Sequence, residues 1–327
     1  MRHGLLTVTL SDYVHTFGTW MRTRHGERVH KVAIEAGFTC PNRDGTVGSG
    51  GCTFCNNRSF GPSARSPRAA PEKTVEQQIA AGRVVIARRT GARLLLAYFQ
   101  TYTNTYASVD RLRSLYDRAL SVPGVIGLAI GTRPDCVPDP VLALLAQYQD
   151  EGREVWLELG LQSSFDTTLA AVNRGHGFAA YRDAVQRARR MGLSVCAHLI
   201  IGLPGETIVH ARVTLERVLD LGIDGLKLHP LHVVRRTRLA HAWRCGEYVP
   251  IERDEYLETV ATLVVLTPTG VVFHRLTGTA APDILLAPAW CAGKWSVLNG
   301  IESTLKRLGL RQGGARYPSW TVACDKA

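Results

Sequence analysis

The stretch CPNRDGTVGSGGCTFCNN at residues 40–57 holds three closely spaced cysteines, Cys40, Cys52 and Cys55, on a segment too rich in glycine and asparagine to be helical. It follows residues 30–37, whose composition predicts a strand, so the cysteines are expected on a loop at the end of that strand. Three thiolates are one fewer than a closed zinc site needs, and no cysteine or histidine follows at ligand spacing before Cys136. This pattern predicts an iron–sulfur cluster with three protein ligands and one open coordination position.

Strand-like and helix-like segments alternate along the rest of the chain. The predicted strands cover residues 30–37, 94–100, 125–132, 154–162, 194–202 and 225–232. The predicted helices cover residues 74–90, 109–121, 138–151, 165–172, 181–191 and 207–221. Six strands, each followed by a helical segment, predict an α/β fold with parallel βαβ units. Doubly wound sheets and partial barrels are both built in this way.

The cysteine spacing, with CPNRDG at residues 40–45 and GCTFC at residues 51–55, resembles radical S-adenosylmethionine (SAM) enzymes of the YhcC-like family. It resembles the radical SAM domain of the Elongator catalytic subunit more distantly. The resemblance extends from about Tyr13 to Trp295. It implies an open, partial (β/α)6 TIM-like barrel of the radical SAM type, with ligands bound where the carboxyl ends of the strands meet.

The barrel expectation divides the chain into a core and its extensions. Residues 5–28 place aromatic and apolar side chains at roughly helical spacing, which predicts a helical lid at the edge of the domain. A further helix is expected at residues 251–266 and a further strand at 271–278. The expected parts are an N-terminal helical extension at 1–29, the partial barrel at 30–235, a C-terminal extension closing the barrel at 236–309, and a loose tail at 310–327.

The charge composition leaves two interpretations open. Lysine and arginine number 39 against 28 aspartates and glutamates, a formal net charge of +11, with arginine runs at residues 187–190 and 235–238. An arginine-rich proteome would explain this, and so would a phosphate-bearing partner such as tRNA.

The chain has no apolar run long enough for a membrane span and no secretory segment at its start, so we expect a cytoplasmic enzyme with no membrane partner. The five remaining cysteines are scattered and are expected to be ordinary small apolar residues, which disfavours a second cluster. They are Cys136, Cys196, Cys245, Cys291 and Cys324.

Polar or glycine residues follow each predicted strand, and the resemblance gives several of them a role toward SAM. Asn104 lies where many radical SAM proteins have a Gly-Gly-Glu segment that holds the amino group, although an ordinary polar turn is the alternative. Glu158 and Gln162 share one face of their strand and are expected at the ribose hydroxyls, or else in a structural hydrogen-bonded pair.

Two further motifs complete the expected SAM site. Arg174, in the NRGH run at residues 173–176, suits a bidentate contact with the SAM carboxylate. Gly202 and Leu203 open the GLPGE segment at residues 202–206, whose backbone is expected against adenine because glycine permits close approach.

Other strand-end residues are candidates for substrate contact. Arg133, in a TRPD run, either pairs with Asp135 or reaches the substrate. His198 is expected to face the barrel interior, and His274 lies at the end of the extra strand.

Lys227 and His229 share a strand face, which suggests an anionic or hydrogen-bonding substrate group. A salt bridge from this pair to Glu158 is the alternative. Arg236 stands where the resemblance leads us to expect a glycine.

The resemblance implies an enzyme that uses a 4Fe-4S cluster to cleave SAM reductively to a 5′-deoxyadenosyl radical, with flavodoxin or ferredoxin as the reducing partner. It points toward the carbon-5 substituent of tRNA wobble uridine as the target. A radical enzyme acting on a small molecule, such as a porphyrinogen, remains an alternative, and so does a non-enzymatic zinc-binding module.

Overall fold

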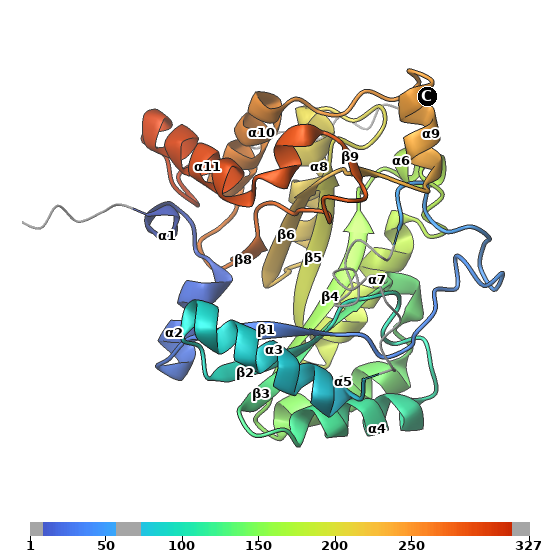
Figure 1. Cartoon of the computed structure of the whole chain (residues 1–327), viewed down its shortest axis with the longest axis vertical. Helices are drawn as coiled ribbons and strands as arrows, with labels where there is room; N and C mark the ends of the chain where they lie inside the picture. The colour runs from blue at the N-terminus through green and yellow to red at the C-terminus, as the bar shows by residue number, and fades with distance from the viewer. Residues whose placement is uncertain (1–8, 57–72, 316–327) are drawn as a thin grey trace, which may run out of the picture.

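The computed structural model describes residues 9–56 and 73–315. Seven parallel strands form one curled sheet in the order β1-β2-β3-β4-β5-β6-β8 (Figure 1). They are β1 Val29–Ile34, β2 Leu94–Phe99, β3 Val125–Thr132, β4 Glu154–Gln162, β5 Ser194–Ile201, β6 Gly225–Pro230 and β8 Val272–Arg275. The expected partial barrel is confirmed. Residues 271–278, predicted as one extra strand, contain β8, which extends the sheet beside β6.

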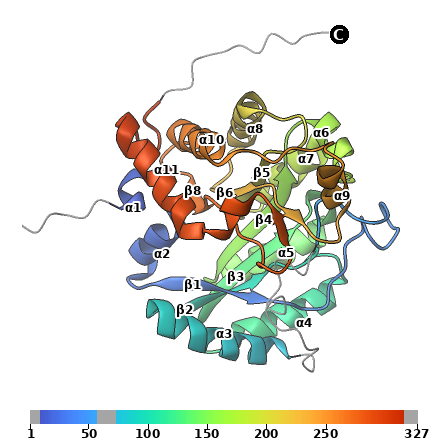
Figure 2. The ribbon, with the colours of Figure 1, turned by 45° about the horizontal axis from the view of Figure 1, so that its top comes forward.

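The helices that connect the strands lie outside the curled sheet (Figure 2). They are α3 Val75–Thr90, α4 Val109–Leu120, α5 Asp139–Asp150, α6 Asp166–Ala171, α7 Phe178–Arg190 and α8 Ile208–Asp220, with a 3-10 turn η3 at Pro134–Cys136. Their apolar faces pack on the outer face of the sheet to form the main core. The ends of α3 illustrate why the segments begin and end as they do. Thr74 and Gln77 form a capping box at its start, and Gly91 takes a left-handed conformation at its end.

The N-terminal helices pack beside the edge strands of the sheet. Helix α1 is a single turn, Leu10–Tyr13, and α2, Phe17–His25, packs against β1 and β8 at the starts of the strands. Phe17 and Trp20 both meet Trp156 edge-on, at ring-centroid distances of 5.8 and 5.4 Å. The residues at helical spacing therefore lie beside the two edge strands of the sheet, and their aromatic rings form an aromatic plug in the floor of the barrel.

The C-terminal part adds elements that the sequence did not reveal. They are β7 Val233–Val234, β9 Leu285–Ala287, α9 Arg238–Arg244, α11 Lys294–Leu308 and the 3-10 turn η4 at Ala289–Ala292, beside the expected helix α10 at Arg253–Leu266. Strands β7 and β9 pair antiparallel, and they are too short to show any periodicity.

The start of the expected tail packs against the fold, because the Gln312 side chain bonds the backbone of Val271 and His15. Residues 316–327 of that tail lie outside the described residues. Within the described ranges, the structure contains no helix with both the length and the apolar character to cross a membrane.

Candidate functional site

A cavity of about 210 Å³ opens at the carboxyl ends of the strands. The cysteine loop forms one wall, and residues at the ends of β2 to β6 form the others. Eight of the residues singled out in the sequence line it: Cys40, Cys52, Cys55, Arg133, Gln162, Arg174, His198 and His229. The fold therefore brings together, at one end of the barrel, side chains that are up to 189 residues apart in the chain.

The cysteine loop is held by its own backbone and by the segment after β4. The amides of Arg43 and Asp44 both donate to the carbonyl of Cys40, which turns the chain directly after the first cysteine. Asn42 Nδ2 donates to the carbonyl of Asn173 at 2.6 Å. Gly51 has φ +74°, and a Cβ there would lie 2.8 Å from Arg43 Nε. Glycine is thus required immediately before Cys52.

Nitrogen donors surround the sulfur of Cys52. Arg174 Nη1 lies 3.6 Å from Cys52 Sγ, and Asn42 Nδ2 lies 3.8 Å from it. A second guanidinium nitrogen of Arg174 donates to the carbonyl of Gly160 at 2.6 Å. A Cβ at Gly160 would lie 2.9 Å from that nitrogen, so the glycine of β4 makes room for Arg174. Such donors stabilise a thiolate ligand.

The chemistry of this wall fits an iron–sulfur cluster better than a single metal ion. Within the described residues, no three histidine, cysteine or acidic side chains are close enough together to hold one ion. In a cluster each thiolate binds a different iron, so its ligands are spread more widely than those of a mononuclear site. Burial raises the pKa of the Cys55 thiol, which a metal must deprotonate on binding.

Several buried polar atoms of the cavity have no partner among the described residues. They include Thr101 Oγ1, Thr103 Oγ1, Arg174 Nε and His232 Nε2, all on residues that line the cavity. Buried polar groups of folded proteins are nearly always hydrogen-bonded, so these atoms are suited to a polar ligand.

A charged network lies inside the barrel, and Glu158 is at its centre. Glu158 is fully buried, contacts Lys31 at 2.5 Å, and also contacts Lys227. Burial opposes ionisation of this carboxyl, but the two lysines outweigh burial and hold its pKa well below the usual range. Lys227 also donates to the hydroxyl of Tyr98 at 2.8 Å, and Tyr98 lines the cavity. The pairing of Lys227 with Glu158 is therefore present.

The histidines of the barrel are kept neutral by burial. Burial, and then Lys227, lower the pKa of His198 to about 4, although Glu158 opposes this. His198 Nε2 lies 2.9 Å from a Glu158 oxygen, so a neutral imidazole donates through Nε2 and keeps Nδ1 as an acceptor. Burial, and then Arg275, lower the pKa of His229 well below its usual range. Arg133 pairs with Asp135 at 2.7 Å and still lines the cavity, so the two expected roles are compatible.

Six of the candidate residues do not line the cavity. Glu158 and Lys227 lie in the network, and Lys31 donates to Nδ1 of His274 close to Phe17 in the floor. The Asn104 side chain donates to the carbonyl of Gly131 at 2.7 Å. Gly202 and Leu203 lie outside the lining, where the Gly202 carbonyl accepts from Tyr248 and Leu203 is buried in an apolar cluster.

Sequence reasoning did not single out Arg43 or Tyr98, both of which line the cavity. Tyr98 lies two residues after Leu96 on β2, so the two-residue period of the strand would have placed it facing inward. Arg43 lies inside the cysteine motif, where it donates to the carbonyl of Cys55 at 2.6 Å. Its position between Cys40 and Cys52 was the available signal.

Comparison with known proteins agrees with this geometry. The model of the Radical SAM superfamily matches residues 39–218, and that of the Radical_SAM C-terminal domain matches residues 223–307. Protein YhcC of Escherichia coli K12 is 46% identical over 311 residues, 95% of this chain and 98% of that protein.

Elongator complex protein 3 of Homo sapiens is 30% identical over 166 residues, 48% of this chain and 28% of that protein. The structure of archaeal Elp3 from Methanocaldococcus infernus, lacking its N-terminus, overlays with a TM-score of 0.64 at 19% identity. That overlay covers 87% of this chain and 64% of the archaeal one, and it shows a shared fold.

Proposed function

Because the chain belongs to the radical SAM superfamily, and within it to the YhcC-like family, we propose that Cys40, Cys52 and Cys55 hold a 4Fe-4S cluster beside bound SAM. When bound, the reduced cluster supplies the electron that cleaves SAM to methionine and a 5′-deoxyadenosyl radical. The observation that carries the proposal is the single cavity in which the three thiols and Arg174 meet at the carboxyl ends of the strands.

We assign the SAM carboxylate to Arg174 and the ribose hydroxyls to Gln162. Arg174 has a buried Nε without a partner among the described residues, and a guanidinium suits a carboxylate. Gln162 ends β4 with φ +83°, and its side chain lines the cavity. Glu158 is already bound by Lys31, Lys227 and His198, so its proposed role is to orient His198 rather than to contact ribose.

Substrate contacts are proposed for the cavity residues Arg133, His198 and His229. The neutral histidines offer hydrogen bonds without adding charge, and His198 keeps an acceptor nitrogen through its bond to Glu158. Lys227 acts through Glu158 and Tyr98, and His274 lies too deep for direct contact.

We propose the carbon-5 substituent of tRNA wobble uridine as the substrate. The resemblance to YhcC-like and Elongator-type proteins supports this choice, and so does the net charge of +11. Flavodoxin or ferredoxin is the proposed source of electrons.

The test compares tRNA nucleosides, by mass spectrometry, between a deletion strain and its complemented derivatives. We expect wild type and Cys245→Ala to restore a wobble-uridine nucleoside that Cys52→Ala does not restore. Cys245 is an exposed cysteine outside the cavity lining and therefore a matched control. An unchanged profile in the deletion strain would reject the tRNA substrate and favour a small molecule. SAM cleavage by the purified, reconstituted protein tests the radical chemistry separately.

A further inference from the structure

A second, smaller cavity of about 190 Å³ lies on the outer side of the cysteine loop. Arg43, Arg236 and Arg238 line it, together with Gly50 and Thr237, and we call it the arginine groove. Cys52, Cys55 and Arg43 belong to both this groove and the central cavity, so the two adjoin. Among the described residues, no acidic side chain contributes to the lining.

The three arginines of the groove have no carboxylate partner in the described part of the chain. Arg43 and Arg238 each donate one bond to a neutral carbonyl, those of Cys55 and Gly51, both at 2.6 Å. A guanidinium has five N–H donors, so Arg238 keeps several free donors, while Arg43 also interacts with the Cys55 thiol. The groove is thus a concentration of positive charge in which no carboxylate of the described residues pairs with the three arginines, although the Cys55 thiol interacts with Arg43.

Arg236 is held in an unfavourable backbone conformation. Its φ is +62°, the left-handed region in which a non-glycine residue costs roughly 1–2 kcal/mol. The family resemblance leads us to expect glycine at this position, and the structure gives the reason. An exposed arginine kept at such a site, with no intramolecular bond made by its side chain among the described residues, indicates a function for the charge.

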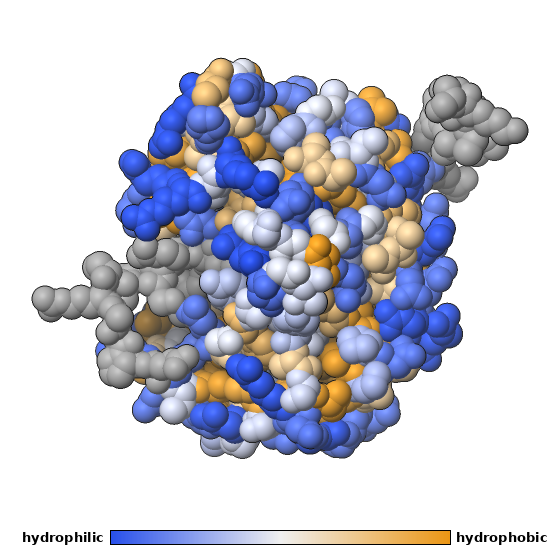
Figure 3. All heavy atoms as spheres, turned by 90° about the vertical axis from the view of Figure 1, so that its right-hand side faces the viewer, coloured by the Kyte–Doolittle hydropathy of each residue, from blue (hydrophilic) through white to orange (hydrophobic). Residues whose placement is uncertain are grey.

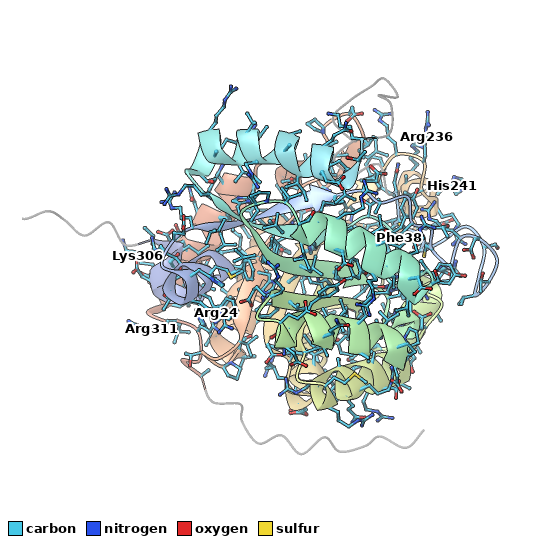
Figure 4. The ribbon with its side chains drawn as sticks, turned by 90° about the horizontal axis from the view of Figure 1, so that it is seen from below. Arg24, Phe38, Arg236, His241, Lys306 and Arg311 are labelled. Carbon is cyan, nitrogen blue, oxygen red and sulfur yellow. The ribbon has the colours of Figure 1, made fainter. Side chains whose placement is uncertain are left out.

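The arginine groove lies at the opposite end of the molecule from another group of cations. Figure 4 shows Arg236 and His241 beside the cysteine loop, with Arg24, Lys306 and Arg311 at the far end. Figure 3 views the molecule from the side on which the cysteine loop projects, and hydrophilic residues border this face. The two ends therefore provide an internal comparison of exposed positive charge.

We propose that the arginine groove binds the backbone phosphates of an RNA strand whose target nucleotide enters the central cavity. This rests on the proposed tRNA substrate. A nucleotide that reaches the cavity past Cys52 and Cys55 brings its flanking phosphates to the rim of the same loop, where the guanidinium groups lie. Arginine binds phosphate oxygens bidentately, and such contacts position an RNA strand without reading its sequence.

The test measures binding of the reconstituted holoenzyme to a fluorescein-labelled tRNA anticodon stem-loop by fluorescence anisotropy at several salt concentrations. Three variants are compared with wild type: Arg236→Glu, Arg236→Lys, and the control Lys306→Glu, which makes nearly the same charge change at an exposed site on α11. Iron content and SAM cleavage without RNA are measured in each, and all three variants should match wild type.

We expect Arg236→Glu to weaken binding by about tenfold and to lower the slope of log K against log salt by about 1–2, because phosphate contacts are lost. Arg236→Lys keeps the charge but not the bidentate geometry, so it should weaken binding less than Arg236→Glu does, and Lys306→Glu should bind nearly as wild type does. If Arg236→Glu and Lys306→Glu weaken RNA binding equally, or if neither weakens it, the proposed role of the arginine groove is wrong, while the proposed tRNA substrate is unaffected. No binding of the stem-loop by wild type would overturn both.

Discussion

The two ends of the barrel differ in how completely their polar groups are satisfied. In the floor, Glu154 accepts from Arg24, His25 and the Trp156 indole, and aromatic rings fill the remaining space. At the mouth, buried atoms of Asn42, Thr101, Thr103, Arg174 and His232 lack partners among the described residues. His274 Nε2 is an exception near the floor.

The difference separates stability from function within one sheet. A polar group left unpaired in the interior costs about 1–3 kcal/mol, so a fold keeps several together only where a ligand supplies the missing bonds. Changes in the floor should therefore alter mainly the free energy of unfolding. Changes at the mouth, the cavity at the carboxyl ends of the strands, should alter mainly the binding of iron, SAM and substrate. Each prediction below tests one side of that division.

The largest expected effect is the loss of iron from Cys52→Ala. The remaining two thiolates cannot hold the cluster, so bound iron and SAM cleavage should both disappear while far-UV circular dichroism stays unchanged. Iron assay and visible absorbance after anaerobic reconstitution give the measurement. Cys245→Ala should retain full iron. Undiminished iron in the Cys52→Ala protein would contradict the assignment of the cluster to the three cysteines of the cavity.

Trp156→Ala should lower the free energy of unfolding by about 3–5 kcal/mol, because it empties the aromatic plug of the floor. Urea unfolding followed by circular dichroism measures this. Trp295 is 73% exposed, and Trp295→Ala should stay within about 0.5 kcal/mol of wild type. If Trp156→Ala does not fold, Trp156→Phe gives a smaller loss in the same direction. Equal stability of the two tryptophan-to-alanine variants would contradict the division.

Arg174→Gln should weaken SAM binding by about 10- to 100-fold, since a hydrogen bond to a charged group contributes about 1.5–3 kcal/mol. Calorimetric titration of reconstituted protein with SAM provides the value. Iron content must be measured in parallel because Arg174 also contacts Cys52 Sγ. Arg190→Gln, at an exposed site on α7, is the control. Unaltered SAM affinity with full iron would remove Arg174 from the site.

The smallest effect concerns pH. The pKa of His198 is lowered from 6.5 to about 4 on folding, chiefly by burial, so between these values the unfolded chain binds a proton that the folded chain does not. The stability contribution is complete above pH 6.5 and is lost as pH falls toward 4. His198→Gln should reduce the slope of unfolding free energy against pH by about 1.4 kcal/mol per unit. An unchanged slope for His198→Gln would argue against a buried, neutral imidazole.

Local patterns predicted the sheet and much of the mouth. The strand predicted at residues 154–162 coincides with β4, and the others end near the observed positions, because apolar runs bounded by turns are a local property. Cys40, Cys52 and Cys55 follow β1 and Gln162 ends β4, so parallel packing brings them together, whereas Arg174 reaches the cavity from the segment after α6.

What could not be predicted depends on contacts between distant residues. Lys31 meets Glu158 across 127 positions of the chain, and nothing in either local sequence specifies that pairing. The orientation of the Asn104 side chain, which does not line the cavity, also could not be predicted from the strand that precedes it. Tyr102 takes φ +66° in between, so the alternation of faces no longer holds after that residue.

The aromatic plug also bears on the order of events in a catalytic cycle. Because the aromatic rings of α2 fill the end of the described barrel opposite the cysteine loop, we expect cofactor and substrate to enter from the side of that loop. The molecule that binds deeper in the cavity should then bind first and dissociate last. The aromatic plug would thereby set the order of binding and release without contacting either molecule.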